Sequence, residues 1–344
     1  MTSRAFIAVL ALTALRLGAA EESGGLAPFV PPINSSNVFR LWGSAPLAGV
    51  AKNWIEGFRA LHPEIKIETR LDGTGLAMPG LYTGAADLAL FGREPNRTDR
   101  DGFEHVLGYK HLQLEIAAGS VSHAGHTTAL GVFVHRDNPL ARLTLAQLDA
   151  LFGHERRRGA PRQLRTWGDL GLTGEWAARP IHLFAPDTRS GPRIFFQLTV
   201  LRDSRKWNWE RLTEFADKKN SAGTVRHAAA QILAALAADR DGLAVATLGL
   251  PNPQVKPLAL ATDAPDRDTD FVSPTRETVA SRAYPLARPI YLCVNRRPGA
   301  PLDAKTKAFL DYVLSPAGQQ AVAATEVYLP LAPDAARRQR ALLD

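Results

Sequence analysis

The chain has 344 residues, of which 22% are charged, and its formal net charge is +7 at neutral pH. Its length leaves room for two domains with separate cores, and its single cysteine excludes an internal disulfide. The positive charge favours anionic ligands or an anionic membrane surface. The sequence has no basic motif interleaved with aromatic residues, so nothing in it favours nucleic-acid binding.

The first twenty residues have the pattern of a secretory signal peptide. Arg4 precedes an apolar run at residues 5–15, and small residues at 18–20 lie ahead of Glu21. The run is too short for a membrane anchor and ends at Arg16, and no cysteine suited to a lipid anchor follows it. We therefore expect a signal peptide at residues 1–20 and a soluble exported protein, periplasmic or secreted, without a lipid anchor. Removal of the signal peptide lowers the formal charge from +7 to +5.

A proline-rich leader precedes a series of short apolar runs. Residues 21–35 predict a flexible leader, and residues 251–274, rich in proline and aspartate, predict an exposed excursion. The last apolar run holds Cys293 between apolar neighbours, so we expect a buried thiol. Runs typical of strands lie at residues 38–42, 65–71, 87–91, 130–134, 181–184, 243–246 and 290–294.

Helical patterns lie between several of these runs. After Ser44, apolar residues recur at three- and four-residue intervals and form one face of a helix: Leu47, Val50, Trp54, Phe58 and Leu61. Further helices are predicted at residues 145–152 with Thr144 as N-cap, at 225–238, at 305–314 and at 315–323. The alternation of strands and helices predicts an α/β fold with mainly parallel sheets.

Three short turns rich in glycine, serine and threonine each separate a strand-like run from a stretch that opens a helix. They are Gly43-Ser44, Gly73-Thr74-Gly75 and Ser190-Gly191. The first turn of a helix leaves backbone N–H groups unpaired and carries partial positive charge, and a hydroxyl adds a directed hydrogen bond. Three such corners that converge on one point would hold a tetrahedral anion. Each corner taken alone is also explained as an ordinary helix cap.

Several segments follow one another in a specific order along about nine-tenths of the chain after the signal peptide. They are Leu41-Trp42-Gly43-Ser44, Asp72-Gly73-Thr74-Gly75, the segments 84–94 and 131–139, Ser190-Gly191, Tyr284-Pro285-Leu286-Ala287-Arg288-Pro289-Ile290-Tyr291 and the segment 309–331. With these segments the chain resembles the phosphate-binding proteins of bacterial phosphate ABC transporters, which have the class II periplasmic binding-protein fold. The last two segments are the most specific part of the resemblance, and they identify a fold more securely than a ligand.

The resemblance implies a two-lobed α/β fold with a mainly parallel sheet in each lobe and a two-strand hinge. It places lobe I at residues 36–130 and 287–344, and lobe II at residues 131–286. The lobes would close by hinge motion over phosphate or a related oxyanion, which an ABC importer would then receive. The resemblance also implies a permease partner, a monomeric state and no cofactor, metal site or catalytic residue.

Carried over residue by residue, the ligands of the family fall on the three corners. Each corner would supply backbone N–H groups, and Ser44, Thr74 and Ser190 would add hydroxyl groups. The implied ligands are Ser44, Ala45, Thr74, Gly75, Ser190 and Gly191.

The sequence departs from the family pattern on the second lobe. Pro192 follows Gly191 where the family usually has threonine, so that a hydroxyl and a backbone donor are missing. An arginine of the family falls on Pro186, and Arg189 is close enough in sequence to substitute for it.

A second departure concerns the carboxylate that accepts the proton of hydrogen phosphate in the family. Its position falls near Gly92 and Arg93, where no aspartate is present, and Arg93 is instead suited to a bidentate pair with an oxyanion. A carboxylate acceptor would select protonated phosphate over sulfate, so its loss leaves the choice of anion open. Asp72, Glu94 or Asp187 would replace it as proton acceptor, or serve only as turn and surface charges.

Other features of the sequence leave alternatives open. The arginine-rich segment 154–165 is either a solvated surface loop or a basic patch that attracts anions or anionic lipid. His123 and His126 are too few for a metal site, and no nucleophile motif accompanies the serines of the corners. The alternative to solute capture is a sensory or protein-interaction module derived from a binding protein, and phosphatase activity is the least favoured function.

Overall fold

The structure is a computed structural model, which describes residues 37–123, 125–262, 267 and 270–344. The predicted signal peptide and the leader lie outside the described residues. Residues 38–344 belong to a single compact unit, so the sheets, helices and cavities of this unit are described together.

The first sheet contains the N-terminal strands together with one strand from the end of the chain. Its order is β2-β1-β3-β14-β4, where β2, β1 and β3 are parallel and β14 is antiparallel to both of its neighbours. The strands are β1 (Val38–Gly43), β2 (Lys66–Arg70), β3 (Leu88–Phe91), β4 (Leu112–Ala118) and β14 (Pro289–Val294).

The second sheet is built from the middle of the chain. Its order is β12-β5-β11-β7-β8, where β11, β7 and β8 are parallel and β5 is antiparallel to β11 and β12. The strands are β5 (Leu130–His135), β7 (His182–Pro186), β8 (Leu212–Phe215), β11 (Gly242–Thr247) and β12 (Val255–Pro257). Two small ladders join β6 (Arg142–Thr144) to β13 (Ala259–Ala261) and β9 (Lys218–Lys219) to β10 (Val225–Arg226).

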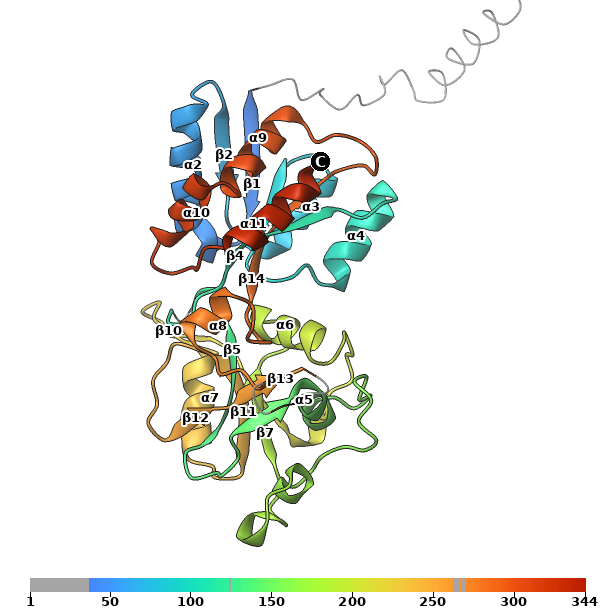
Figure 1. The fold of residues 1–344 in the computed structure, drawn as a ribbon, viewed down its shortest axis with the longest axis vertical. Helices are drawn as coiled ribbons and strands as arrows, with labels where there is room; N and C mark the ends of the chain where they lie inside the picture. Colours follow the sequence, from blue (N-terminus) through green and yellow to red (C-terminus); the bar gives the residue numbers. More distant parts are fainter. Residues whose placement is uncertain (1–36, 124, 263–266, 268–269) are drawn as a thin grey trace, which may run out of the picture. The chain divides into compact units, whose positions relative to one another are not determined.

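The chain passes between the two sheets twice, from β4 to β5 and back again to β14 (Figure 1). We call each sheet with its helices a lobe, and the two connecting segments the crossings. Strands β14 and β5, which adjoin the crossings, run antiparallel to their neighbours in the sheets. The expected parallel arrangement holds for three adjacent strands of each sheet. The two-lobed α/β fold is confirmed, and each sheet as a whole is mixed. The residue limits predicted for the lobes stay a prediction.

Helices cover both faces of the first sheet (Figure 1). One face carries Phe39 and Leu41 and packs against α2, α9 and α10, while the other carries Phe91 and Cys293 and packs against α3 and α4. Cys293 is fully buried and free, as predicted. The helices of this lobe are α2 (Ala48–Leu61), α3 (Thr74–Tyr82), α4 (Arg97–Leu107), α9 (Ala304–Val313), α10 (Pro316–Ala323) and α11 (Pro333–Arg340).

The second lobe has one continuous hydrophobic core around its sheet. Helix α7 packs on β11, β7 and β8, and α6 packs on β7. The helices of this lobe are α5 (Leu145–Phe152), α6 (Gly191–Thr199), α7 (Ala228–Ala237) and α8 (Arg276–Ala280). Short 3₁₀ turns occur in both lobes, at Ala45–Leu47, Trp167–Leu170, Gly174–Trp176, Trp209–Arg211 and Ala341–Leu343.

The apolar spacing after Ser44 and the N-cap pattern at Thr144 correctly predicted two helices. Val50, Trp54 and Phe58 are buried on one face of α2, although Leu61 at its end is 64% exposed. Thr144 caps α5 as predicted, because its Oγ1 accepts a hydrogen bond from the Gln147 N–H at 3.1 Å.

Two predictions about the second lobe are corrected. The helix expected at residues 225–238 begins at Ala228, because Val225 and Arg226 pair with β9 as strand β10. The exposed excursion expected at 251–274 contains β12 and β13, with Leu258 and Leu260 fully buried, because β12 adds to the edge of the second sheet and β13 pairs with β6. Within the described residues, no helix combines the length and apolar character needed to cross a bilayer.

Candidate functional site

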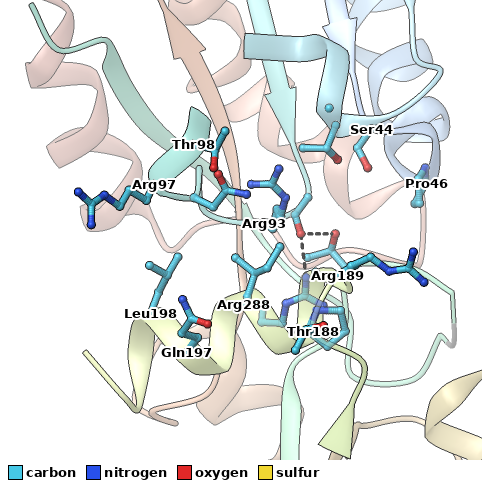
Figure 2. Close-up of a pocket in the computed structure, with 18 of the residues that line it drawn as sticks. Ser44, Pro46, Arg93, Arg97, Thr98, Thr188, Arg189, Gln197, Leu198 and Arg288 are labelled. Atoms are coloured by element: carbon cyan, nitrogen blue, oxygen red, sulfur yellow. Dashed lines mark hydrogen bonds between the residues drawn. The ribbon is translucent and has the colours of Figure 1, made fainter. Parts of the chain in front are cut away.

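A cavity of about 740 Å³ is lined by residues of both lobes and of the crossings (Figure 2). Six of the residues proposed from the sequence line it, namely Ser44, Thr74, Gly75, Arg93, Arg189 and Gly191. Four others do not line it, namely Ala45, Asp72, Glu94 and Ser190. The corners after β1, before α3 and before α6 therefore meet at one cavity, although each contributes fewer groups than the sequence implied.

The first corner places a buried hydroxyl at the cavity. Ser44 follows β1 and is 8% exposed, and its own N–H donates to the Leu90 carbonyl at 3.0 Å. Its hydroxyl does not cap the following 3₁₀ turn. A Cβ on Gly92 would lie 3.5 Å from Ser44 Oγ and 2.4 Å from Thr127 Oγ1, so only glycine fits between these two hydroxyls. From Ser44 the anion would therefore receive the hydroxyl and not the N–H.

The second corner presents the uncapped N-terminus of α3. The Gly73 N–H donates to the Gly43 carbonyl at 3.1 Å, which ties this corner to the first. No side chain caps the helix. Thr74 and Gly75 are the first two helical residues, so their N–H groups have no intrahelical acceptor. This corner offers two N–H groups and a hydroxyl at the positive end of a helix dipole.

Arg93 lines the cavity from the segment that follows β3. Its Nη1 donates to Asp99 Oδ2 at 2.6 Å and to the Glu94 carbonyl at 3.0 Å, and its side chain is 11% exposed. Asp99 is fixed in turn by the capping box that it forms with Asn96 at the start of α4. The ion pair holds one end of the guanidinium, and the donors that remain can bind an anion.

The second-lobe corner uses its serine as a helix cap. Ser190 Oγ donates to the Asp187 carbonyl at 2.7 Å and accepts from the Arg193 N–H at 3.3 Å. The Ser190 N–H also donates to the Asp187 carbonyl, at 3.1 Å. Ser190 lines a second cavity of about 450 Å³, which shares Gly191 with the first. Because Pro192 has no N–H, the start of α6 contributes only the Gly191 N–H to the main cavity, which Thr188 of the same corner also lines.

Arg189 lines the cavity but extends away from its centre, as Figure 2 shows. Its side chain is 92% exposed, and its nearest carboxylate is Asp187 at 3.7 Å. As it stands, this side chain is a poor substitute for an inward-pointing arginine, because water screens an exposed charge.

None of the three carboxylates suggested as proton acceptors lines the main cavity. Asp72 is exposed and accepts from Arg70 Nε at 2.8 Å, and Asp187 Oδ1 accepts from the Arg189 N–H at 3.0 Å. Burial raises the pKa of Glu94, opposed by the charge of Arg100. Among the described residues that line the cavity, Asp203 alone carries a carboxylate, and its Oδ2 lies 3.6 Å from Arg100 Nη2 of α4.

Sequence reasoning missed a basic residue at the floor of the cavity. Arg288 precedes β14 on the returning crossing and is 3% exposed. Its Nη2 donates to the Gly92 carbonyl at 3.0 Å, and Thr127 Oγ1 donates to the same carbonyl at 2.9 Å (Figure 2). The available signal was a single charge within the apolar stretch from Leu286 to Val294.

The arginine-rich segment 154–165 is held by local partners. Arg157 pairs with Glu155 at 2.8 Å, and Arg162 pairs with Asp169 at 2.7 Å. Arg158 donates to the carbonyls of Thr199 and Val200, where α6 ends. None of these residues lines the cavity, so the segment supports the second lobe instead of forming part of the anion site.

His123 and His126 each lie next to a hydroxyl group. His123 Nδ1 lies 3.0 Å from Ser122 Oγ, and His126 Nδ1 lies 3.1 Å from the Tyr328 hydroxyl. In the part of the chain that the structure describes, no three histidine, cysteine, aspartate or glutamate side chains are grouped as a metal site would require.

Known proteins share this fold over most of their length. A family model described as a PBP superfamily domain matches residues 30–317. The phosphate-binding protein PstS of Pseudomonas aeruginosa is 31% identical over 336 residues, which cover 96% of each chain. PstS from Borrelia burgdorferi has a TM-score of 0.56 at 15% identity, covering 86% of this chain and 99% of its own. An ABC-type phosphate transport receptor from Vibrio cholerae has a TM-score of 0.53 at 18% identity, covering 85% and 100%.

Proposed function

This chain belongs to the PBP superfamily, in the family of the phosphate-binding protein PstS, and we propose that it captures phosphate or a closely related oxyanion for an ABC importer. The anion would be captured outside the cytoplasm, because the predicted signal peptide would deliver the chain there. The relatives are named as binding proteins and a transport receptor, and the task needs no bond to be made or broken.

The observation that carries this proposal is the chemistry of the cavity wall. Two helix N-termini, those of α3 and α6, open at the cavity, and Arg93 and Arg288 line it. Helix N-termini and guanidinium groups are the two means by which proteins most directly hold phosphate. Hydroxyl groups of Ser44 and Thr74 add donors that fit a tetrahedral anion.

We infer a sequence of binding steps from the distribution of these groups. The anion enters the open cavity and first contacts the first lobe, which supplies most of the donors. Movement at the crossings then brings the Gly191 N–H of the second lobe onto the anion. A permease that separates the lobes would remove this last contact and release the anion. The protein would act as a monomer, because a single chain supplies every group.

Isothermal titration of the purified protein tests this proposal. Phosphate, sulfate, a phosphonate and molybdate are each titrated into protein freed of anions by unfolding, dialysis and refolding. Phosphate should bind with a stoichiometry of one, and Arg97→Met should bind as well as wild type, because Arg97 is exposed and paired with Asp101. Absence of heat with all four anions, in protein whose far-ultraviolet circular dichroism shows it to be folded, would contradict oxyanion capture.

A further inference from the structure

Arg288 is a buried cation at the junction of the two lobes. The residue is 3% exposed, and its guanidinium donates from Nη2 to the Gly92 carbonyl at 3.0 Å and from Nη1 to the Thr128 carbonyl at 3.2 Å. A guanidinium has five N–H donors. Two of them are used here, and Nε is buried without a partner. Three donors of this fixed, planar group therefore have no acceptor among the residues that the structure describes.

The charge of Arg288 lacks a partner of opposite sign. Burial lowers the pKa of Arg288 to about 10, which still leaves it charged at neutral pH. Arg93 acts on it as a further positive charge. Across the described residues no carboxylate pairs with Arg288. An isolated buried charge raises the free energy of the folded state. The burial of Arg288 therefore favours the binding of a compensating anion.

A second buried arginine shows how this chain balances such a charge with its own residues, although Nε and Nη2 of Arg193 also have no hydrogen-bond partner. Arg193 is 1% exposed, but Glu214 Oε1 lies 3.6 Å from its Nη2. Its guanidinium also stacks over the Trp207 ring, with Cζ 3.4 Å from the centroid, which adds a cation–π contact. Arg288 has a phenylalanine ring at 5.8 Å and, among the described residues, no carboxylate, so its charge is less well balanced than that of Arg193.

Three positive groups surround the space beside Arg288. A Cβ on Gly191 would lie 3.2 Å from Arg288 Nη2 and 3.9 Å from Arg93 Cβ, so the start of α6 and both arginines border the same point. Glycine at this position keeps the space free of side-chain atoms. An oxyanion there would lie against the Arg288 guanidinium and the start of α6, with Arg93 of the first lobe at the border of the same space.

We propose that Arg288 is an anion-binding residue and that the tetrahedral oxyanion captured in the cavity is its counter-ion. The inference deepens the proposed function and rests on it. It assigns to the crossing a direct contact with the ligand, in addition to the donors of the corners. Because Arg288 adjoins the strand around which the lobes move, the same contact links occupancy of the cavity to the position of the hinge.

The test compares wild type with Arg288→Met and Arg288→Lys by titration with phosphate and sulfate and by thermal melting with and without each anion. Arg288→Met should bind at least about 100-fold more weakly, since the loss of a buried charged contact is large. Arg288→Lys should bind with intermediate affinity, because it keeps the charge without the planar fork. Melting of ligand-free Arg288→Met should stay within about 3 °C of wild type or rise, because a lone buried charge is removed.

A purely structural arginine would give the opposite pattern. Ligand-free Arg288→Met would then melt far below wild type, and its folded fraction would bind phosphate within about threefold of wild type, which would overturn the inference. Arg97→Met, which removes an exposed arginine from the same cavity, is the matched control and should bind as wild type.

If Arg288→Met fails to fold, Gly191→Ala tests whether Arg288 binds the anion. The φ of Gly191 lies outside the left-handed region, so alanine fits its backbone, yet the added Cβ enters the space beside Arg288. We expect at least about tenfold weaker anion binding with little change in ligand-free melting. Unchanged binding would overturn the inference. A wild-type protein that binds sulfate but not phosphate would contradict phosphate capture while leaving the role of Arg288 intact, and a wild type that binds neither would contradict both.

Discussion

The corners of the first lobe and the corner of the second lobe use similar residues for different purposes. Ser44 and Thr74 line the cavity, and neither hydroxyl is used to cap a helix. Ser190 has the same kind of hydroxyl, but it caps α6 and lies in the adjoining cavity. A serine before a helix is therefore equally suited to hold a ligand or to hold its own helix.

This difference distributes the binding energy unevenly between the lobes. Of the groups at the corners, the first lobe offers two N–H groups and two hydroxyls, whereas the start of α6 offers one N–H because Pro192 follows Gly191. Thr188 and Gln197 of the second lobe also line the cavity. We expect the first lobe to set the affinity and the second lobe to set how firmly the cavity closes. Substitutions on the two sides should therefore have effects of different size and kind.

Among substitutions at the three corners, loss of a first-lobe hydroxyl should have the largest effect on phosphate affinity. Thr74→Ala removes a donor to a charged ligand and should weaken phosphate binding by about 10-fold to 100-fold in titration calorimetry. Thr83→Ala is a matched control at the other end of α3, where the hydroxyl bonds the Pro79 carbonyl. If Thr74→Ala binds phosphate as tightly as Thr83→Ala, the first lobe does not dominate the phosphate affinity.

Restoring the second-lobe corner should strengthen binding. Pro192→Thr adds a backbone N–H and a hydroxyl beside Gly191, and we expect about a tenfold gain in phosphate affinity, seen mainly as slower dissociation in stopped-flow measurements. Pro192→Ala returns the N–H alone and should give a smaller gain. Equal or weaker binding by both variants would show that this corner does not reach the anion.

Removal of the Ser190 hydroxyl should affect stability more than binding. Ser190→Ala removes the cap of α6 and should lower the free energy of unfolding by about 1 kcal/mol, measured by urea denaturation. Phosphate affinity should change by less than about threefold. A tenfold loss of affinity at unchanged stability would instead place this hydroxyl on the ligand.

The smallest effect is expected at Arg189. Its side chain is 92% exposed, so Arg189→Ala should change phosphate affinity by less than about twofold at 150 mM salt. At low salt the difference in phosphate affinity between Arg189→Ala and wild type should be larger, because fewer ions then screen the charge of Arg189. A tenfold loss at both salt concentrations would show that Arg189 turns inward when the anion binds.

Local patterns in the sequence predicted the elements and the corners well. The buried face of α2 and the cap at Thr144 depend on residues a few positions apart, so spacing alone revealed them. Arg288 contacts Gly92 and Thr128 from 196 and 160 residues away, and only the folded crossings bring these groups together. The role of Ser190 was ambiguous for a different reason, since a cap and a ligand require the same residue type.

The complete burial of Cys293 has a practical consequence. Burial raises the pKa of this thiol well above its usual value, so maleimide dyes should not label it in the folded protein. The chain therefore already behaves as a thiol-free background for labelling. A cysteine introduced in place of the exposed Arg189 at the cavity edge would carry one fluorophore per molecule, and its emission would report closure in real time as an optical sensor for the anion.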